Sequence, residues 1–157
     1  KDVQSGISKL SKFNLTFDLL VTPIQLQSAT KLVKIFPNQK FVLDHIAKPR
    51  ISEPLNKTWV SDIINLSKYS NVFCKISGLV TETKGYNFSE TDFLPFLDVI
   101  FKYFGFDRIM YGSDWPVCLL AADYKKVLEI ISNYLMSYDS KIREKIMGTN
   151  AKIFYNL

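Results

Sequence analysis

Histidine and cysteine are scarce in this 157-residue chain, which contains one histidine and two cysteines. Cys74 and Cys118 are too few for a disulfide framework, so we expect free thiols in a reducing, cytoplasmic compartment. The chain also lacks any apolar stretch near the ~20 residues needed to span a bilayer, and its amino terminus shows no secretory pattern. These absences argue against a disulfide-stabilised secreted protein and against a membrane partner.

Several motifs that bind nucleotides or carry a nucleophile are missing as well. The sequence has no P-loop, no G-x-G-x-x-G, no G-x-S-x-G elbow and no Cys-x-x-Cys pair. Its formal charge of +5 could suit nucleic acid or an anionic substrate, but the lysines are spread along predicted helices and turns, which indicates solvated helix faces. Phosphate cradling, serine esterase chemistry and a nucleic-acid partner therefore lack support.

What the chain does have is the composition of a globular domain. It is 47% hydrophobic, 22% charged and 14% aromatic, which predicts one packed domain over residues 1–157. That length is short for a complete eight-stranded α/β barrel of roughly 250 residues. Because the chain begins with Lys1 rather than methionine, we expect either a piece of a longer protein or an incomplete sequence.

Strand and helix patterns alternate along the chain. Apolar runs predict strands over residues 15–21, 40–44, 72–77 and 108–113. Helical spacing and end signals predict helices over about 22–36, 59–70 and 93–104, then three helical pieces over 124–136, 140–147 and 150–155, with Gly148 as a break. This alternation implies parallel pairing, either as half of an eight-fold barrel or as a small doubly wound sheet.

Polar side chains gather where the predicted strands end, which is where ligands bind in either architecture. Burying several ionisable groups at one rim of an apolar sheet costs free energy that stability alone does not explain. The residues in question are Asp18, Asp44, His45, Lys75, Ser77, Ser113 and Asp114.

His45 and Asp114 are the best candidates for chemistry. A lone histidine is more often structural, but a strand end beside Asp18 and Asp114 favours a functional role. Neighbouring strand residues point to opposite faces, so Asp44 shares the face of His45 only if the strand ends between them. We expect Asp44 to be structural, satisfying backbone or helix groups. The sharp turn after Gly112 presents Asp114 at the strand tip, where a helix cap is the alternative role.

The remaining candidates each allow two interpretations. Lys75 and Ser77 share one strand face and could bind an anionic or hydroxylated substrate, although Lys75 could equally extend to solvent. Asp18 is either a paired core carboxylate or a substrate contact. Cys74 lies on the other face without a basic partner, which argues against a thiol nucleophile.

Five segments resemble the lactonase-like branch of the amidohydrolase superfamily, which includes fuconolactonases and rhamnonolactonases. The resemblance extends over nearly the whole chain in the order of the family. It is carried by residues 17–21 (FDLLV), 42–49 (VLDHIAKP), 74–82 (CKISGLVTE), 108–116 (RIMYGSDWP) and 150–155 (NAKIFY).

The resemblance implies a hydrolase in which an activated water opens a sugar lactone or a similar small molecule. The fold would be the C-terminal half, strands five to eight, of a TIM-type (β/α)8 barrel. Asp114 would take the proton of the attacking water, while His45 polarises the lactone carbonyl or holds a divalent metal that does so. Lys75, Ser77, Glu82, Trp115 and Asp18 would contact the substrate.

The resemblance also bears on which metal the site would bind and on which partners the chain would have. If the longer protein uses a metal, zinc being the first choice, His45 and Asp114 would be ligands, but two ligands do not close a site. The family's strand-one histidine pair is absent here, so we expect the chain alone to be catalytically inactive. We also expect it to form a homo-oligomer or to associate with the missing N-terminal half. The alternative function is a non-catalytic half-barrel that serves as a scaffold or regulator.

Overall fold

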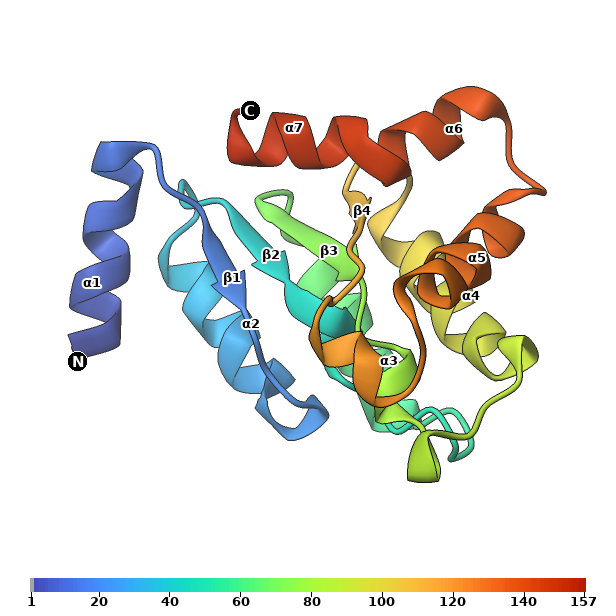
Figure 1. The fold of residues 1–157 in the computed structure, drawn as a ribbon. Coiled ribbons are helices and arrows are strands. Elements are labelled where there is room, and N and C mark those ends of the chain that lie inside the picture. The colour runs from blue at the N-terminus through green and yellow to red at the C-terminus, as the bar shows by residue number, and fades with distance from the viewer. Residues whose placement is uncertain (1) are drawn as a thin grey trace.

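Four short strands form one parallel sheet in the order β1, β2, β3, β4 (Figure 1). The computed structural model describes residues 2–157. The strands are β1 (Phe17–Leu19), β2 (Phe41–Leu43), β3 (Val72–Ile76) and β4 (Ile109–Tyr111). Each predicted strand is present, and each is shorter than its apolar run.

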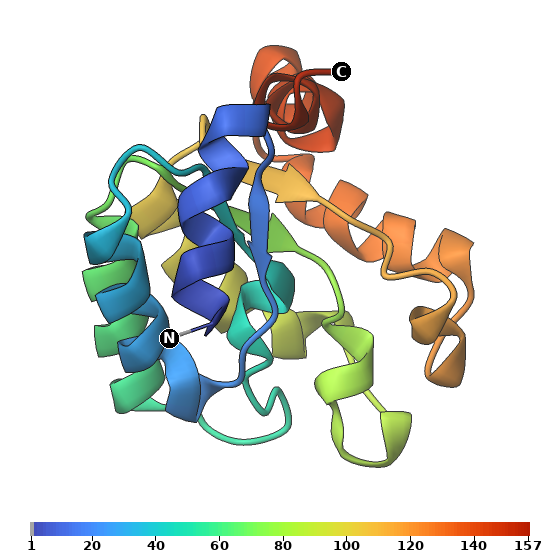
Figure 2. The same cartoon turned by 90° about the vertical axis from the view of Figure 1, so that its left-hand side faces the viewer.

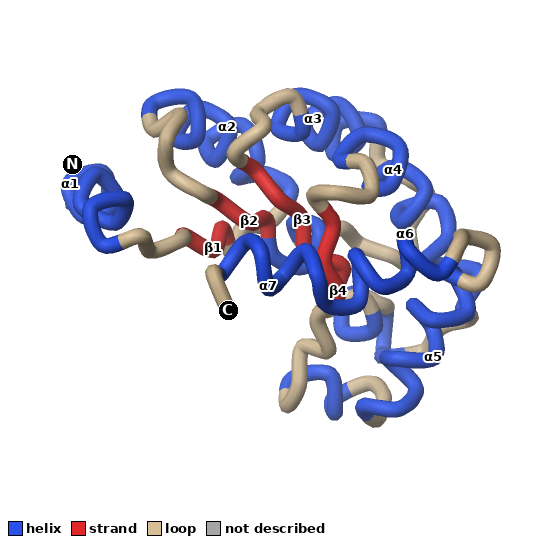
Figure 3. Tube along the Cα trace, turned by 90° about the horizontal axis from the view of Figure 1, so that it is seen from above, coloured by secondary structure: helices blue, strands red, loops and turns tan. Residues whose placement is uncertain are grey.

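Three crossover helices cover one face of this sheet. Figure 3 shows α2, α3 and α4 along an arc behind the strands, and Figure 2 shows them from the side. The α-helices of the described residues are α1 (Asp2–Leu10), α2 (Leu26–Ile35), α3 (Lys57–Ser67), α4 (Leu94–Phe104), α5 (Tyr124–Leu135), α6 (Ser140–Glu144) and α7 (Asn150–Tyr155). Among residues 2–157, no helix combines the length and apolar character that crossing a membrane requires.

The sequential strand order decides between the two architectures left open by the sequence. A doubly wound sheet reverses its strand order and places crossover helices on both faces. Here every crossover between neighbouring strands is local, and the crossover helices lie on one side. The fold is therefore α/β with a singly wound parallel sheet.

The two faces of the sheet carry different side chains because successive strand residues alternate. Towards the helices lies a large core that includes Phe41, Cys74 and Ile109. The opposite face, which we call the inner face, carries a smaller apolar cluster in which Val42 and Met110 are at most 1% exposed. Asp18 and Lys75 lie on the same inner face by register.

Helix α7 closes part of the inner face. It crosses the sheet near the amino ends of the strands (Figure 1). From this helix Phe154 packs against Val42 and Met110. The sequence predicted a helix break at Gly148, and this prediction is wrong. A π-helical turn over Lys145–Thr149 joins α6 to α7 instead. Helix α1 was not predicted, because Gly6 and two serines weaken its pattern; Ile7, 2% exposed, anchors it.

Candidate active site

His45 sits in a left-handed turn directly after β2. Residues 45–48 all have positive φ angles, of 50°, 47°, 63° and 51°. This conformation costs roughly 1–2 kcal/mol for each non-glycine residue. The turn is held because Ile46 and Ala47 are fully buried and the indole of Trp59 donates to the Ile46 carbonyl at 3.0 Å. The fold thus fixes the backbone from which His45 projects.

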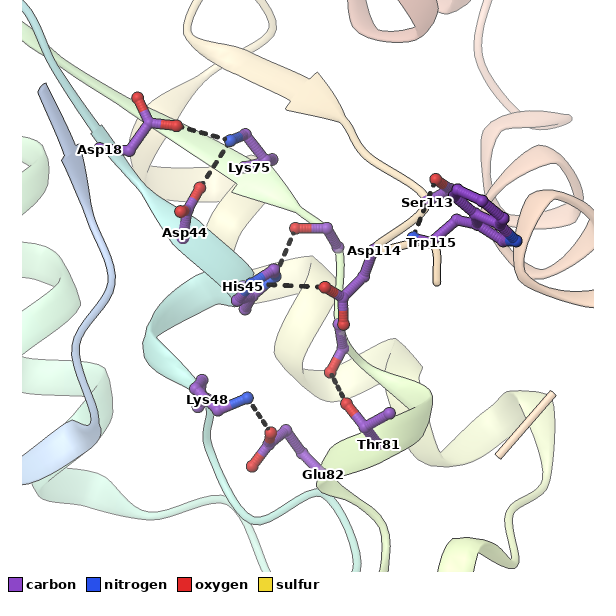
Figure 4. A network of polar contacts seen from close by, with 12 residues as sticks. Asp18, Asp44, His45, Lys48, Lys75, Thr81, Glu82, Ser113, Asp114 and Trp115 are labelled. Atoms are coloured by element: carbon purple, nitrogen blue, oxygen red, sulfur yellow. Dashed lines mark hydrogen bonds and ion pairs between the residues drawn. The ribbon is translucent and has the colours of Figure 1, made fainter. Parts of the chain in front are cut away.

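Asp114 also occupies a left-handed position, with φ 57°, directly after the turn that ends β4. Its backbone carbonyl accepts from the Cys118 N–H at 2.8 Å, and its carboxylate caps no helix in the following 3-10 turn, Val117–Leu120. The cap role considered for Asp114 is therefore not what the structure shows. The carboxylate points towards His45 instead (Figure 4).

We call His45 and Asp114 the strand-end pair. Nε2 of His45 lies 3.6 Å from Oδ1 of Asp114, and the side chains are 15% and 11% exposed. That distance is too long for a hydrogen bond, so each group retains the capacity to bind a third molecule that lies beside the pair. Burial lowers the pKa of His45, and Asp114 and Asp44 offset this only in part, which favours the neutral imidazole.

The end of β3 holds the other side of the imidazole. Ser77 Oγ lies 2.8 Å from His45 Nδ1, and Ser77 is 3% exposed. Gly78, at φ +61°, packs so closely that a Cβ there would lie 2.7 Å from Nδ1 and 2.8 Å from Cγ of the ring. Ser77 was predicted to contact the substrate, whereas the structure pairs it with His45. The sequence did not predict a role for Gly78 at this site. The available signal was a glycine directly after Ser77, at the end of a predicted strand.

Lys75 belongs to a separate cluster on the inner face. Its Nζ lies 2.6 Å from Asp44 Oδ1 and 3.0 Å from Asp18 Oδ2, and the Tyr155 hydroxyl donates to the same Asp18 oxygen at 2.9 Å. Burial alone would lower the pKa of Lys75, but hydrogen bonds to Asp44 and Asp18 outweigh it and hold that pKa above its usual value. This lysine is ion-paired rather than extended to solvent.

The cluster corrects the prediction for Asp44. Strand β2 ends at Leu43, so Asp44 opens a 3-10 turn and no longer follows strand alternation. Its carboxylate therefore reaches the inner face and pairs with Lys75, instead of satisfying backbone or helix groups. Asp18 takes the paired-carboxylate role that the sequence left open.

Glu82 and Trp115 lie outside both groups. Glu82 forms an ion pair with Lys48, a residue that sequence reasoning did not single out, while Trp115 is 63% exposed and lies beside Ser113, away from His45 (Figure 4). Lys48 and Glu82 also line a cavity of about 490 Å³ whose wall does not include the strand-end pair. The other lining residues are Thr22, Pro23, Ile24, Pro49, Arg50, Glu53, Pro54, Asn56, Trp59 and Phe96.

The donor set does not complete a metal centre. Within residues 2–157, no three histidine, cysteine, aspartate or glutamate side chains converge as ligands. A catalytic zinc site commonly takes three protein ligands plus water, and the strand-end pair supplies two donor groups. The described residues therefore do not fit a complete zinc site, and we assign no step to a metal.

Comparison with known proteins gives matches along the whole chain. The family profile described as "Amidohydrolase" matches residues 2–157. An L-fucono-1,5-lactonase of Burkholderia ambifaria is 32% identical over 99% of this chain and 54% of its own length. An L-rhamnono-gamma-lactonase of Scheffersomyces stipitis is 24% identical over 85% of this chain and 45% of its own.

A solved structure gives the same result in three dimensions. An amidohydrolase from Burkholderia multivorans, crystallised with bound zinc, superposes with a TM-score of 0.92 at 32% identity. The match covers 99% of this chain and 57% of that one. The chain thus spans about half the length of the relatives it matches.

Proposed function

Because the chain belongs to the amidohydrolase family, we propose that it carries part of the active site of a hydrolase that opens sugar-acid lactones. The similarity to proteins named L-fucono-1,5-lactonase and L-rhamnono-gamma-lactonase confirms the resemblance to the lactonase-like branch that the sequence predicted. The single observation that carries the proposal is the strand-end pair, an imidazole after β2 and a carboxylate after β4 that lie 3.6 Å apart. We further propose a reducing compartment, since Cys74 and Cys118 are buried free thiols.

In this proposal the four strands are strands five to eight of a TIM-type barrel. The support is their sequential order, the outer arc of crossover helices and a carboxylate after the last strand, Asp114. After β4 the described chain is helical and adds no strand. The first four strands would then come from the half of the relatives that this chain does not match.

The proposed chemistry divides between the two side chains. Asp114 accepts a proton from the water that attacks the lactone carbonyl carbon, and His45 Nε2–H donates to the carbonyl oxygen as it gains negative charge. When the ring bond breaks, Asp114 returns the proton to the departing ring oxygen. The products are a carboxylic acid and a hydroxyl group, so atoms and protons balance without a further reactant.

We propose fewer substrate-contacting residues than the sequence suggested. Glu82 faces a cavity of about 490 Å³, within the roughly 300–1,000 Å³ usual for small-molecule sites. Its carboxylate and the Lys48 ammonium could each bind sugar hydroxyls there. Trp115 is exposed enough to contact a substrate, whereas neither Asp18 nor Lys75 lines this cavity. A divalent metal belongs to the proposal only where the longer protein adds donors to His45 and Asp114.

The test is lactone hydrolysis by a longer protein that joins this chain to the half it lacks relative to its matches. Acid release from L-fucono-1,5-lactone is followed, and Asp114→Asn should lower turnover at least about 100-fold, as expected for loss of a general base. Asp107→Asn, which changes a 79% exposed surface carboxylate, is the matched control. Near-normal turnover in Asp114→Asn would refute the assignment.

The scaffold alternative makes a different prediction in the same experiment. A non-catalytic half-barrel would show no acid release whether or not the complementary half is supplied, by fusion or in trans. Turnover that appears only when both halves are present supports the enzyme, and turnover by the 157-residue chain alone would show that it holds a complete site.

A further inference from the structure

Ser77 is the buried neighbour of the imidazole whose role is still open. It is 3% exposed, and its Oγ has one side-chain partner among the described residues, His45 Nδ1 at 2.8 Å. A serine hydroxyl can donate or accept, so the distance alone leaves the direction of this hydrogen bond undetermined. The direction matters, because it decides which ring nitrogen of a neutral histidine carries the proton.

The position of Asp114 resolves the direction. Its Oδ1 faces Nε2 across 3.6 Å, in a setting where both side chains are at least 85% buried. A bare nitrogen lone pair facing a carboxylate is repulsive, whereas an N–H facing it is attractive, and low polarity strengthens both effects. The favoured neutral imidazole therefore carries its proton on Nε2, which leaves Nδ1 as an acceptor.

We propose that the Ser77 hydroxyl donates to His45 Nδ1 and thereby holds the imidazole as the Nε2–H tautomer, aimed at the space beside Asp114. Ser77 is a positioning residue in this scheme, since it acts through His45 and not on a substrate. Gly78 completes the hold, because its missing Cβ lets the β3 end lie against the ring at a distance that no other residue allows.

The inference rests on the proposed function for its catalytic consequence. With Ser77 donating, His45 offers an N–H to the lactone carbonyl and cannot act as the base at Nε2, which leaves proton acceptance to Asp114. Loss of the Ser77 hydroxyl should then lower kcat more than it raises KM. We expect about a 10-fold loss of kcat in Ser77→Ala of the longer protein, at the lower end of the roughly 10–100-fold lost when a group that orients a metal-bound histidine is removed.

The direct test uses the single histidine of the chain, which makes its ring nitrogen signals unambiguous. In a two-bond 1H–15N spectrum at a pH where the imidazole is neutral, we expect a protonated-type Nε2 and an unprotonated Nδ1 shifted by its hydrogen bond. In Ser77→Ala the Nδ1 signal should move towards that of a free unprotonated nitrogen. Ser67→Ala is the matched control, since Ser67 is 6% exposed and its hydroxyl donates to the Ile64 carbonyl.

Two results would overturn the inference: a proton on Nδ1 in the unmodified chain, or an Nδ1 signal that Ser77→Ala leaves unchanged. The first can be seen without any variant, so a poorly folding Ser77→Ala does not prevent the test. If the expected spectrum is found but the longer protein hydrolyses no lactone, the proposed function fails and the tautomer assignment stands. If the longer protein hydrolyses the lactone but the ring carries its proton on Nδ1, the proposed function stands and the tautomer assignment fails.

Discussion

Replacing Lys75 with methionine should destabilise the chain through the carboxylate that it leaves behind. Lys75 Nζ lies 2.6 Å from Asp44 Oδ1, and the two side chains are 20% and 14% exposed. Breaking a fully buried ion pair costs about 3–5 kcal/mol, and an exposed pair contributes about 0.2–1 kcal/mol. For this intermediate exposure we expect Lys75→Met to lower the free energy of unfolding by about 2–3 kcal/mol, or the melting temperature by roughly 4–12 °C.

The second part of the prediction separates charge from packing. If the cost comes from the unpaired Asp44 carboxylate, then the Lys75→Met, Asp44→Asn double variant should recover about 1–2 kcal/mol relative to the sum of the single changes. Urea unfolding followed by circular dichroism measures all four proteins. Lys125→Met is the matched control, because Lys125 is 82% exposed in its pair with Glu129 and should contribute less than about 0.5 kcal/mol. Strict additivity of Lys75 and Asp44, or equal effects at Lys75 and Lys125, would refute the reasoning.

Three further predictions concern the turn, the imidazole and the metal. Trp59→Phe leaves the buried Ile46 carbonyl without its indole donor and should lower the free energy of unfolding, measured in urea, by about 1–3 kcal/mol. The control Trp115→Phe, at a 63% exposed site, should change it by less than about 0.5 kcal/mol. Equal effects of the two substitutions would contradict this account of the turn. An NMR titration of His45 should give a midpoint below the ordinary pKa of about 6.5. As the pH falls through about 6.5, the unfolded chain takes up a proton on His45 before the folded chain does, so the free energy of unfolding should decrease. A midpoint above about 6.5 would be contrary evidence. Zinc titrated calorimetrically into the chain should bind weakly, and tight stoichiometric binding lost in His45→Ala would reveal a complete site.

The strands and the inner-face residues could be predicted because they depend on local pattern. Phe41–Leu43 is fully buried, so a continuous apolar run was the correct signal for β2. Strand alternation placed Lys75 and Cys74 on opposite faces, as the structure confirms, and Ser77, which follows the strand, approaches Gly112 together with Lys75. Asp114 was identified because a glycine-containing turn follows an apolar strand, a signal contained within six residues of sequence.

The partners of these residues could not be predicted, because they depend on where backbone geometry changes. None of residues 45–48 is glycine, so nothing in the sequence signals four successive left-handed residues. Without that turn, the placement of Asp44 beside Lys75 cannot be deduced. The Tyr155–Asp18 bond joins residues 137 positions apart, a separation that one sequence without its fold does not encode in any local pattern.

The position of α7 has a consequence for how the chain is made. Val42, Phe73 and Met110 form the inner apolar cluster, and the residues that cover them, Phe154 and Tyr155, follow Met110 by more than forty positions. During synthesis on a ribosome the sheet can assemble while that surface is still bare. A nascent chain stalled before α7 therefore offers an apolar strip to chaperones or to other chains, and translation of the α7 segment ends that exposure.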